Sequence, residues 1–140
     1  MASIFTKIIA GELPGRLVWK DDVCVAMLTI APLRPGHTLV IPRREVDHWL
    51  DLDDATAAHL LKVAKSIGKG LMQGFKPAKV GLLIAGLEVR HVHLHVVPIN
   101  AVSDLDFARQ DPNATTVDLD RSAERIRESL RALGYSQVAG

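Results

Sequence analysis

The chain has 140 residues, 48% of them hydrophobic and 24% charged, which is typical of one globular domain with its own core. Its formal net charge is +1, and its basic residues are scattered apart from Arg43 and Arg44, which argues against a nucleic-acid groove. The apolar run at the N-terminus is broken by Lys7 and is too short for a signal peptide or a membrane span, so we expect a cytoplasmic protein with no membrane partner. Cys24 is the one cysteine, so it cannot form an internal disulfide, and its apolar neighbours predict a buried strand.

The first half of the chain predicts a short helix followed by three strands. Ser3 can cap a helix that ends near Gly11, because isoleucines recur on one side of the segment between them. Short strands at residues 17–19 and 23–30 are separated by two aspartates, which favour a turn, so they should form a hairpin. The loop APLRPGH, with its two prolines and one glycine, then leads into a strand at residues 38–42.

The middle of the chain predicts a long helix and a pair of strands. Apolar residues recur at three- and four-residue spacing over residues 52–75, and an aspartate at the start of this amphipathic helix can cap it. Residues 80–85 form a continuous apolar run and residues 89–97 alternate strictly. We therefore expect a central antiparallel pair of strands joined through Gly86.

The C-terminal part predicts a loop and a last helix. Residues 101–117 lack periodicity, whereas residues 121–133 carry apolar side chains at helical spacing. The complete pattern predicts an α+β fold, in which one long helix packs on an antiparallel sheet of about five strands and short helices lie at both ends.

The stretch RHVHLHVVPIN places three of the six histidines at alternate positions of a predicted strand. Successive side chains of a strand point to opposite faces, so His91, His93 and His95 should share one face while the apolar residues between them face the core. One interpretation is a half-exposed strand on which histidine merely tolerates solvent. A second is a metal site, although rings spread over about 13 Å cannot all bind one ion through bonds of about 2 Å.

A third interpretation is nucleophilic and acid/base chemistry. The ordinary histidine pKa of about 6.5 keeps a neutral imidazole available at pH 7. Of two neighbouring rings, one could attack a phosphorus atom while the other assists the leaving group. Gly86 lets the backbone approach a ligand closely, and N–H groups there could hold phosphate oxygens. His37 follows a Pro-Gly turn, where a lone histidine is more often structural than catalytic, and His48 and His59 are interpreted as surface or packing residues.

Taken together, these segments resemble the histidine triad family of nucleotide hydrolases and transferases, whose signature alternates three histidines with apolar residues. Residues 91–97 match that signature, and the blocks IFTKIIAGELP and LTIAPLRPGHTLVIPRR, with a long helix between the second block and the triad, agree in order and spacing. The resemblance covers residues 3–98. It implies a histidine triad domain at residues 1–100 and a variable extension at residues 101–140, packed on the same domain or on a partner subunit.

The resemblance also implies an activity and a role for individual residues. Members cleave at the α-phosphorus of small-molecule nucleotides, here expected to be nucleoside phosphoramidates or related conjugates, as homodimers without a metal or other cofactor. His93 would be the nucleophile that forms a nucleotidyl-histidine intermediate, and His95 would contact the phosphate and the leaving group. His91 would orient His93, and His37 would complete the cluster. The residues expected to bind the nucleotide are Ile8, Val18, Leu28, Thr29, Ile30, Gly86, Glu88 and Val89.

Several positions depart from the usual pattern of the family. Thr29 stands where many members have an acidic residue that binds the ribose, and Leu87 stands where an amide side chain is typical. Glu88 would repel a phosphate unless it points away or serves an amine-bearing leaving group. Ser3 and Thr6 stand where many bacterial relatives have a zinc-binding Cys-x-x-Cys, so no structural zinc is expected.

Three other functions stay open from the sequence. A dinucleoside polyphosphate hydrolase of the same family would use the same histidines. A nucleotide-binding module with little turnover would fit the changes at Thr29 and Leu87 and the shortened turn before Gly86. A metal-dependent hydrolase would contain bound zinc.

Overall fold

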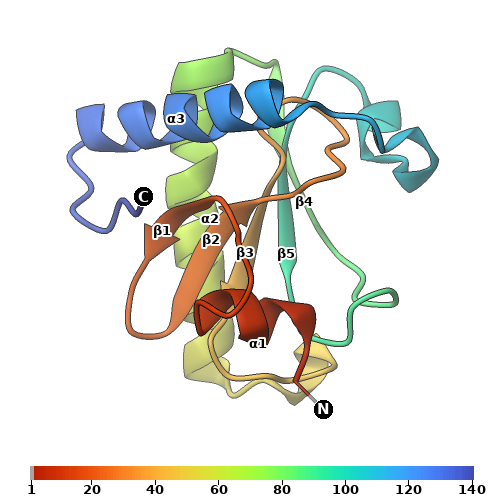
Figure 1. Ribbon diagram of the computed structural model, residues 1–140, viewed down its shortest axis with the longest axis vertical. Helices are drawn as coiled ribbons and strands as arrows, with labels where there is room; N and C mark the ends of the chain where they lie inside the picture. The colour runs from red at the N-terminus through yellow and green to blue at the C-terminus, as the bar shows by residue number, and fades with distance from the viewer. Residues whose placement is uncertain (1) are drawn as a thin grey trace.

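The computed structural model describes residues 2–140 as an α+β domain built on one five-stranded antiparallel sheet (Figure 1), which confirms the predicted fold class. The strand order across the sheet is β1-β2-β3-β5-β4. The strands are β1 at Leu17–Lys20, β2 at Cys24–Leu28, β3 at Thr38–Pro42, β4 at Lys79–Ile84 and β5 at Leu94–Ile99. The helices are α1 at Ile4–Ile9, α2 at Asp54–Phe75 and α3 at Thr116–Ala132, with short 3-10 helices at Trp49–Asp51, Val102–Leu105 and Phe107–Arg109.

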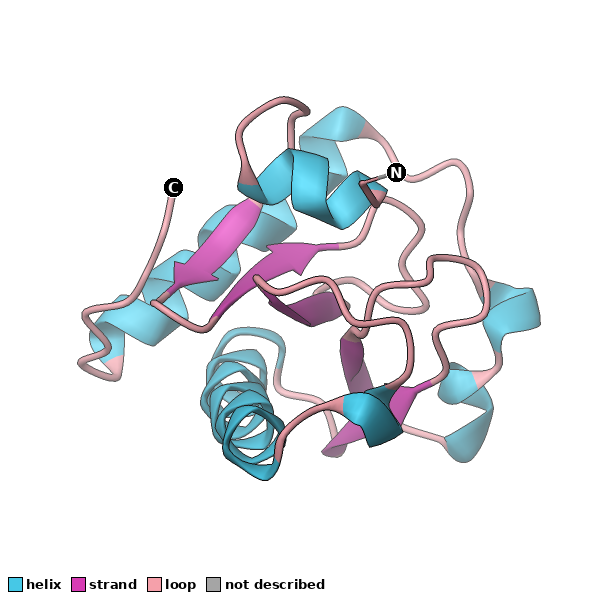
Figure 2. Cartoon of the chain, turned by 90° about the horizontal axis from the view of Figure 1, so that it is seen from below, coloured by secondary structure: helices cyan, strands magenta, loops and turns pink. Residues whose placement is uncertain are grey.

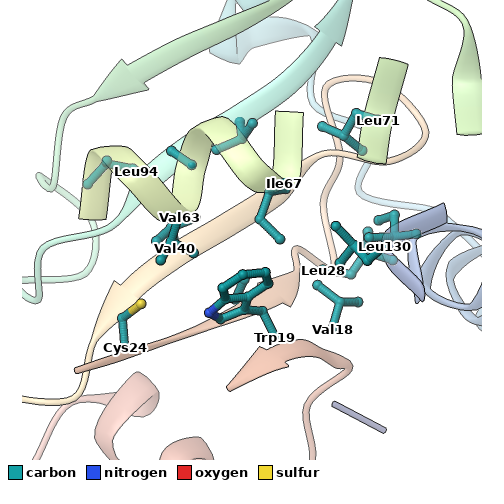
Figure 3. Packing of buried hydrophobic residues seen from close by; sticks show 14 of the residues in the cluster. Val18, Trp19, Cys24, Leu28, Val40, Val63, Ile67, Leu71, Leu94 and Leu130 are labelled. Atoms are coloured by element: carbon teal, nitrogen blue, oxygen red, sulfur yellow. The ribbon is translucent and has the colours of Figure 1, made fainter. Parts of the chain in front are cut away.

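The sheet is covered on both faces, because α1 and α2 lie on opposite sides of it (Figure 2). On the face toward α2 and α3, which we call the α2 face, buried residues of both helices pack against side chains of the strands (Figure 3). They include Val18, Trp19, Leu28, Val40, Leu60, Ile67, Leu71, Leu94, Ile126 and Leu130. On the opposite side, which we call the α1 face, a smaller cluster contains Phe5, Val25, Met27, Leu39 and Ile41.

The helices begin at capping residues that the sequence supplies. Ser3 and Asp53 each accept a hydrogen bond from a backbone N–H of the first turn, as predicted for α1 and α2. The predicted start of the last helix at Arg121 is wrong, because α3 begins more than a turn earlier. Thr115 caps it, and Leu119 in the added turn is buried in the core on the α2 face.

The strand that carries the histidines is shorter than the predicted 89–97, and its partner is an edge strand instead of a central one. β5 begins at Leu94, and β4 lies at the end of the sheet. Val92 donates its N–H to a carbonyl of the loop before α2 at 2.8 Å, so this part of the chain leaves the β4 ladder. The predicted alternation still holds, since Val92, Leu94 and Val96 all lie in the core on the α2 face.

The C-terminal residues 101–140 fold onto the same chain. α3 packs on α2 and β1, and the Arg127 guanidinium donates to the backbone carbonyl of Leu17 at 2.8 Å. The predicted loop at residues 101–117 contains two 3-10 helices. None of the helices within residues 2–140 is both long and apolar enough to cross a membrane.

Replacing Leu130 with alanine should lower the free energy of unfolding by about 2–5 kcal/mol, because this fully buried side chain joins α3 to α2. Urea denaturation followed by circular dichroism measures the change. Val117→Ala on the same helix is the control, since this side chain is 57% exposed and its loss should change stability by less than about 0.5 kcal/mol. Equal effects of the two substitutions would show that α3 does not unfold with the domain.

Candidate active site

Four histidines meet on the α1 face of the sheet. The antiparallel pairing of β3 with β5 places His95 opposite Leu39, and His37, which directly precedes β3, comes to lie beside it. His91 and His93 belong to the extended segment before β5. All four are buried, with exposures of 0% for His37 and His91 and 7% for His93 and His95. The structure therefore brings together the four histidines that the sequence predicts to be catalytic.

Hydrogen bonds fix the tautomers of His37 and His95. The backbone N–H of Leu33 donates to Nδ1 of His37 at 3.0 Å, so the proton of the neutral His37 ring sits on Nε2. That nitrogen lies 2.9 Å from Nδ1 of His95, which must therefore accept. The proton of His95 is left on its Nε2, where it can be donated to a ligand.

His93 is held in the opposite tautomer. Its Nδ1 lies 2.7 Å from the backbone carbonyl oxygen of His91, and because a carbonyl only accepts, Nδ1 carries the proton. Nε2 of His93 therefore keeps a lone pair. The rings of His93 and His95 are 4.9 Å apart between centroids. The site thus presents a nucleophilic nitrogen next to an N–H donor, a combination suited to displacement at phosphorus.

Burial keeps these rings neutral at pH 7. Burial lowers the pKa of His37 to about 3 and that of His95 to about 4, and repulsion by neighbouring histidines acts in the same direction. Burial also lowers the pKa of His93, against smaller opposing effects of its hydrogen bond to the His91 carbonyl and of the Glu88 carboxylate. A lowered pKa leaves the lone pair of His93 free of a blocking proton.

Two phenylalanines with no predicted role enclose the row of rings. Phe5 of α1 meets His93 edge-on at 5.0 Å between centroids, and Phe107 meets His95 edge-on at 4.9 Å. Phe5 lies inside the block IFTKIIAGELP, so the motif could have pointed to it, whereas Phe107 comes from a segment without periodicity. Both rings help to bury His93 and His95, and burial strengthens electrostatic interactions there.

Some residues predicted to bind the nucleotide lie near the histidines. Ile8 and Val89 pack against the core cluster of the α1 face. Thr29 donates its backbone N–H to the carbonyl of His37 at 3.2 Å. Gly86 adopts the left-handed φ of 77°, which favours glycine, in the turn that leads to Glu88.

The structure does not bring Val18, Leu28 and Ile30 to the histidines. Val18 and Leu28 lie in the core on the α2 face, with exposures of 0% and 4%. Strand alternation turns their neighbours Leu17 and Met27 toward the α1 face in their place. Ile30 is 73% exposed on the loop after β2.

A second polar cluster lies on the α2 face, where the hairpin of β1 and β2 meets α2. Asp21 accepts a hydrogen bond from the indole of Trp19 at 2.9 Å and lies 2.8 Å from Nε2 of His59. Burial, with the charge of Asp21, raises the pKa of the Cys24 thiol, so this cysteine is not a reactive nucleophile. Asp21, Cys24 and His59 form the one group of possible metal ligands found in residues 2–140, with ligand atoms within 4.8 Å of one another. The Cys24 thiol and Nε2 of His59 already have hydrogen-bond partners on Asp21, and these contacts join the hairpin of β1 and β2 to α2.

Comparisons with known proteins agree with this geometry. The HIT domain family profile matches residues 10–102. An uncharacterized HIT-like protein of Borreliella burgdorferi is 42% identical over 102 residues, which cover 68% of this chain and 73% of the relative. An uncharacterized HIT-like protein of Methanocaldococcus jannaschii is 34% identical over 99 residues, which cover 68% of this chain and 77% of the relative.

Solved structures are similar over a longer part of the chain. A zinc-bound histidine triad family protein from Mycobacterium smegmatis has a TM-score of 0.81 at 29% identity, covering 95% of this chain and 96% of the other. A hypothetical histidine triad nucleotide-binding protein from Sulfolobus tokodaii has a TM-score of 0.79 at 30% identity, covering 92% of each chain. The similarity therefore extends into the C-terminal residues that the sequence profile does not match.

The protein should lose stability as the pH falls below about 6.5, because the unfolded chain binds protons on histidines that the folded site keeps neutral. Each such histidine adds a slope of up to about 1.4 kcal/mol per pH unit until the pH reaches its folded-state value, about 3 for His37 and about 4 for His95. Urea unfolding between pH 7 and pH 5 measures this slope, and His37→Gln should make it shallower. A slope that His37→Gln leaves unchanged would contradict the neutral state of the buried pair.

Proposed function

The chain belongs to the histidine triad (HIT) family of nucleotide-binding hydrolases and transferases, and from this premise we propose that it hydrolyses nucleoside phosphoramidates or related nucleotide conjugates at the α-phosphorus. The observation that carries the proposal is the pair of fixed tautomers, with a lone pair on Nε2 of His93 beside an N–H on Nε2 of His95. Attack by an imidazole gives a nucleotidyl-histidine, which divides one difficult displacement into two easier ones.

In the first step, Nε2 of His93 bonds to the α-phosphorus and the bond from phosphorus to the leaving group breaks. The positive charge that develops on the His93 ring is stabilised by its hydrogen bond to the carbonyl of His91, which is already in place. The departing nitrogen takes up one proton from solvent and leaves as a neutral amine, while the N–H on Nε2 of His95 donates a hydrogen bond that stabilises charge on the phosphate and the departing atom.

In the second step, a water molecule attacks the phosphorus of the intermediate. The bond between phosphorus and His93 breaks, the water releases one proton to solvent, and the nucleoside monophosphate leaves. His93 returns to its starting tautomer, and the proton released in this step balances the one taken up in the first, so no net acid or base is consumed. A dinucleoside polyphosphate is open to the same attack, with a phosphate in place of the amine as leaving group.

A nucleotide-binding protein with little turnover is the second candidate. The Thr29 hydroxyl accepts from the backbone N–H of Ala31 at 3.3 Å and so is partly engaged within its own loop. Leu87 is 85% exposed and offers no polar group to a phosphate. Both features weaken substrate contacts without altering the histidine pair, which is why hydrolysis remains the first proposal.

We also propose that the protein forms a homodimer through the free edge of β4 and the adjoining side of α2. Leu61 and Met72 of α2 and Leu82 of β4 are 55%, 42% and 44% exposed, and they line two neighbouring grooves beside this edge. A strand edge flanked by exposed apolar side chains favours pairing with another strand. Two copies of β4 can pair antiparallel about a two-fold axis, which buries both patches at once.

Substitution of His93 by alanine should abolish hydrolysis of an adenosine phosphoramidate, lowering kcat/KM by roughly 10³-fold or more, because the nucleophile is lost. Product release measures turnover, and mass spectrometry of acid-free quenched samples detects the covalent adduct in the wild type alone. His59→Ala, which removes a histidine on the α2 face, is the control and should keep turnover. If the wild type turns over phosphoramidates and dinucleotides no faster than His93→Ala, the binding function replaces the hydrolase.

Leu82→Lys should convert the dimer into a monomer, because each copy would place a charge in the buried interface. Analytical ultracentrifugation at micromolar concentration measures the mass. Val117→Lys adds the same charge on exposed surface of α3 and should leave the dimer intact. A monomeric wild type, or a Leu82→Lys variant that remains dimeric, would contradict this interface.

A further inference from the structure

The N-terminal helix is tied to the triad by polar side chains that the proposed reaction does not use. Oγ of Ser3 lies 2.7 Å from Nδ1 of His91. Oε1 of Glu45, in the loop after β3, accepts from the hydroxyl of Thr6 at 2.7 Å and from the backbone N–H of Ser3 at 2.7 Å. We call Ser3, Thr6, Glu45 and the ring of His91 the Ser3 cluster.

A zinc ion does not fit the Ser3 cluster. Structural zinc sites are built from thiolate and imidazole ligands, with some carboxylates. The cluster supplies two hydroxyls, one imidazole nitrogen and one carboxylate, and the possible ligand atoms of His91 and Glu45 are 4.0 Å apart. The polar atoms that would face a metal at this place already bond to one another.

The donor and the acceptor of each hydrogen bond in the cluster follow from the partners of His91. Nε2 of His91 lies 2.8 Å from the carbonyl oxygen of Pro42 and must carry the proton of the neutral ring, so Nδ1 accepts from the Ser3 hydroxyl. Ser3 Oγ in turn accepts the backbone N–H of Thr6 at 3.0 Å, and the Thr6 hydroxyl donates to Glu45. Both ring nitrogens of His91 are thereby held by hydrogen bonds, and the Glu45 carboxylate lies at the other end of this series of bonds.

We propose that Ser3, Thr6 and Glu45 are positioning residues that hold His91, and through its backbone carbonyl the nucleophile His93, without a metal ion. The inference rests on the proposed function of His93 and extends it. The carbonyl of His91 accepts the Nδ1 proton of His93 at 2.7 Å. A shift of His91 therefore changes both the direction and the tautomer of the nucleophile.

Thr6→Val tests the proposal, because it removes the hydroxyl that bonds to Glu45 and keeps the size of the side chain. We expect the rate constant for forming the covalent adduct to fall about tenfold, which corresponds to one hydrogen bond of about 1.4 kcal/mol. The Kd for a nucleoside monophosphate should stay unchanged, and Thr6→Ser should restore the rate to within about twofold of the wild type.

Thr56→Val is the matched control. The Thr56 hydroxyl donates to the Asp53 carboxylate at 2.7 Å at the start of α2, so this variant loses an equivalent bond at another helix N-terminus. It should keep the wild-type rate of adduct formation. A rate in Thr6→Val equal to that in Thr56→Val overturns the positioning role. Loss of the wild-type rate after dialysis against a chelator, with recovery on adding zinc, overturns the metal-free part of the proposal.

Nitrogen-15 NMR of the histidine rings separates this inference from the proposed function, because it needs no turnover. His93 in the wild type should show a single tautomer with the proton on Nδ1, and Thr6→Val should shift it toward a mixture. If the wild type shows the single tautomer and Thr6→Val the mixture, but no substrate turns over, the positioning role stands and the hydrolase proposal fails. If Thr6→Val keeps the wild-type ring signals, the positioning role fails whatever the activity.

Discussion

The hydrogen bond from Nδ1 of His93 to the backbone carbonyl of His91 is the constraint on which the chemistry of this site depends. In a regular strand that carbonyl would pair with a neighbouring strand. It is free because the chain joins the β4 ladder only at Leu94, and Val92 bonds to the loop before α2 instead. The early end of the ladder therefore gives His93 a partner for one ring nitrogen and leaves the other nitrogen to attack. The irregular backbone here is a requirement of the site.

Burial of four imidazoles is tolerable only because their polar atoms find partners. Within residues 2–140, every buried side-chain nitrogen and oxygen has a hydrogen-bond partner. α1 covers the rings, yet a helix of six residues is too short to be stable by itself. It stays in place through Phe5, which packs against His93, and through Ser3, which bonds to His91. The cover of the site and the site itself thus stabilise each other, and burial under this cover lowers the pKa of His93.

The sequence predicted the parts of the fold that depend on local backbone geometry. Alternation in RHVHLHVVPIN indicated which side chains share a face, because that direction follows from an extended chain alone. The start of β5 could not be predicted, since it depends on a hydrogen bond to the distant residue Val46. Val18 and Leu28 were assigned to the nucleotide from the resemblance to the family, and the sequence alone could not show that they face the core on the α2 face. Because the sheet is covered on both sides, the strands that carry them are apolar on both faces. Their sequence then has no alternation of polar and apolar residues that would show which face a side chain occupies. Phe107 reaches His95 through tertiary contacts of a segment that has no pattern of its own.

The residues that define the chemistry and those that surround the substrate occupy different kinds of structure. The register of β3 against β5 places His95 beside His37, and a single substitution on the surface does not change this register. Thr29, Leu87 and Phe107, by contrast, lie on segments that connect the strands and α-helices, where a chain tolerates replacement. The departures from the usual family pattern fall in these segments and in the Ser3 cluster, while the hydrogen-bonded centre is complete. Such a division lets the leaving group and the base change without rebuilding the nucleophile. The specificity of this protein should therefore be sought in the loops around the triad, and its capacity for catalysis in the backbone that holds His93.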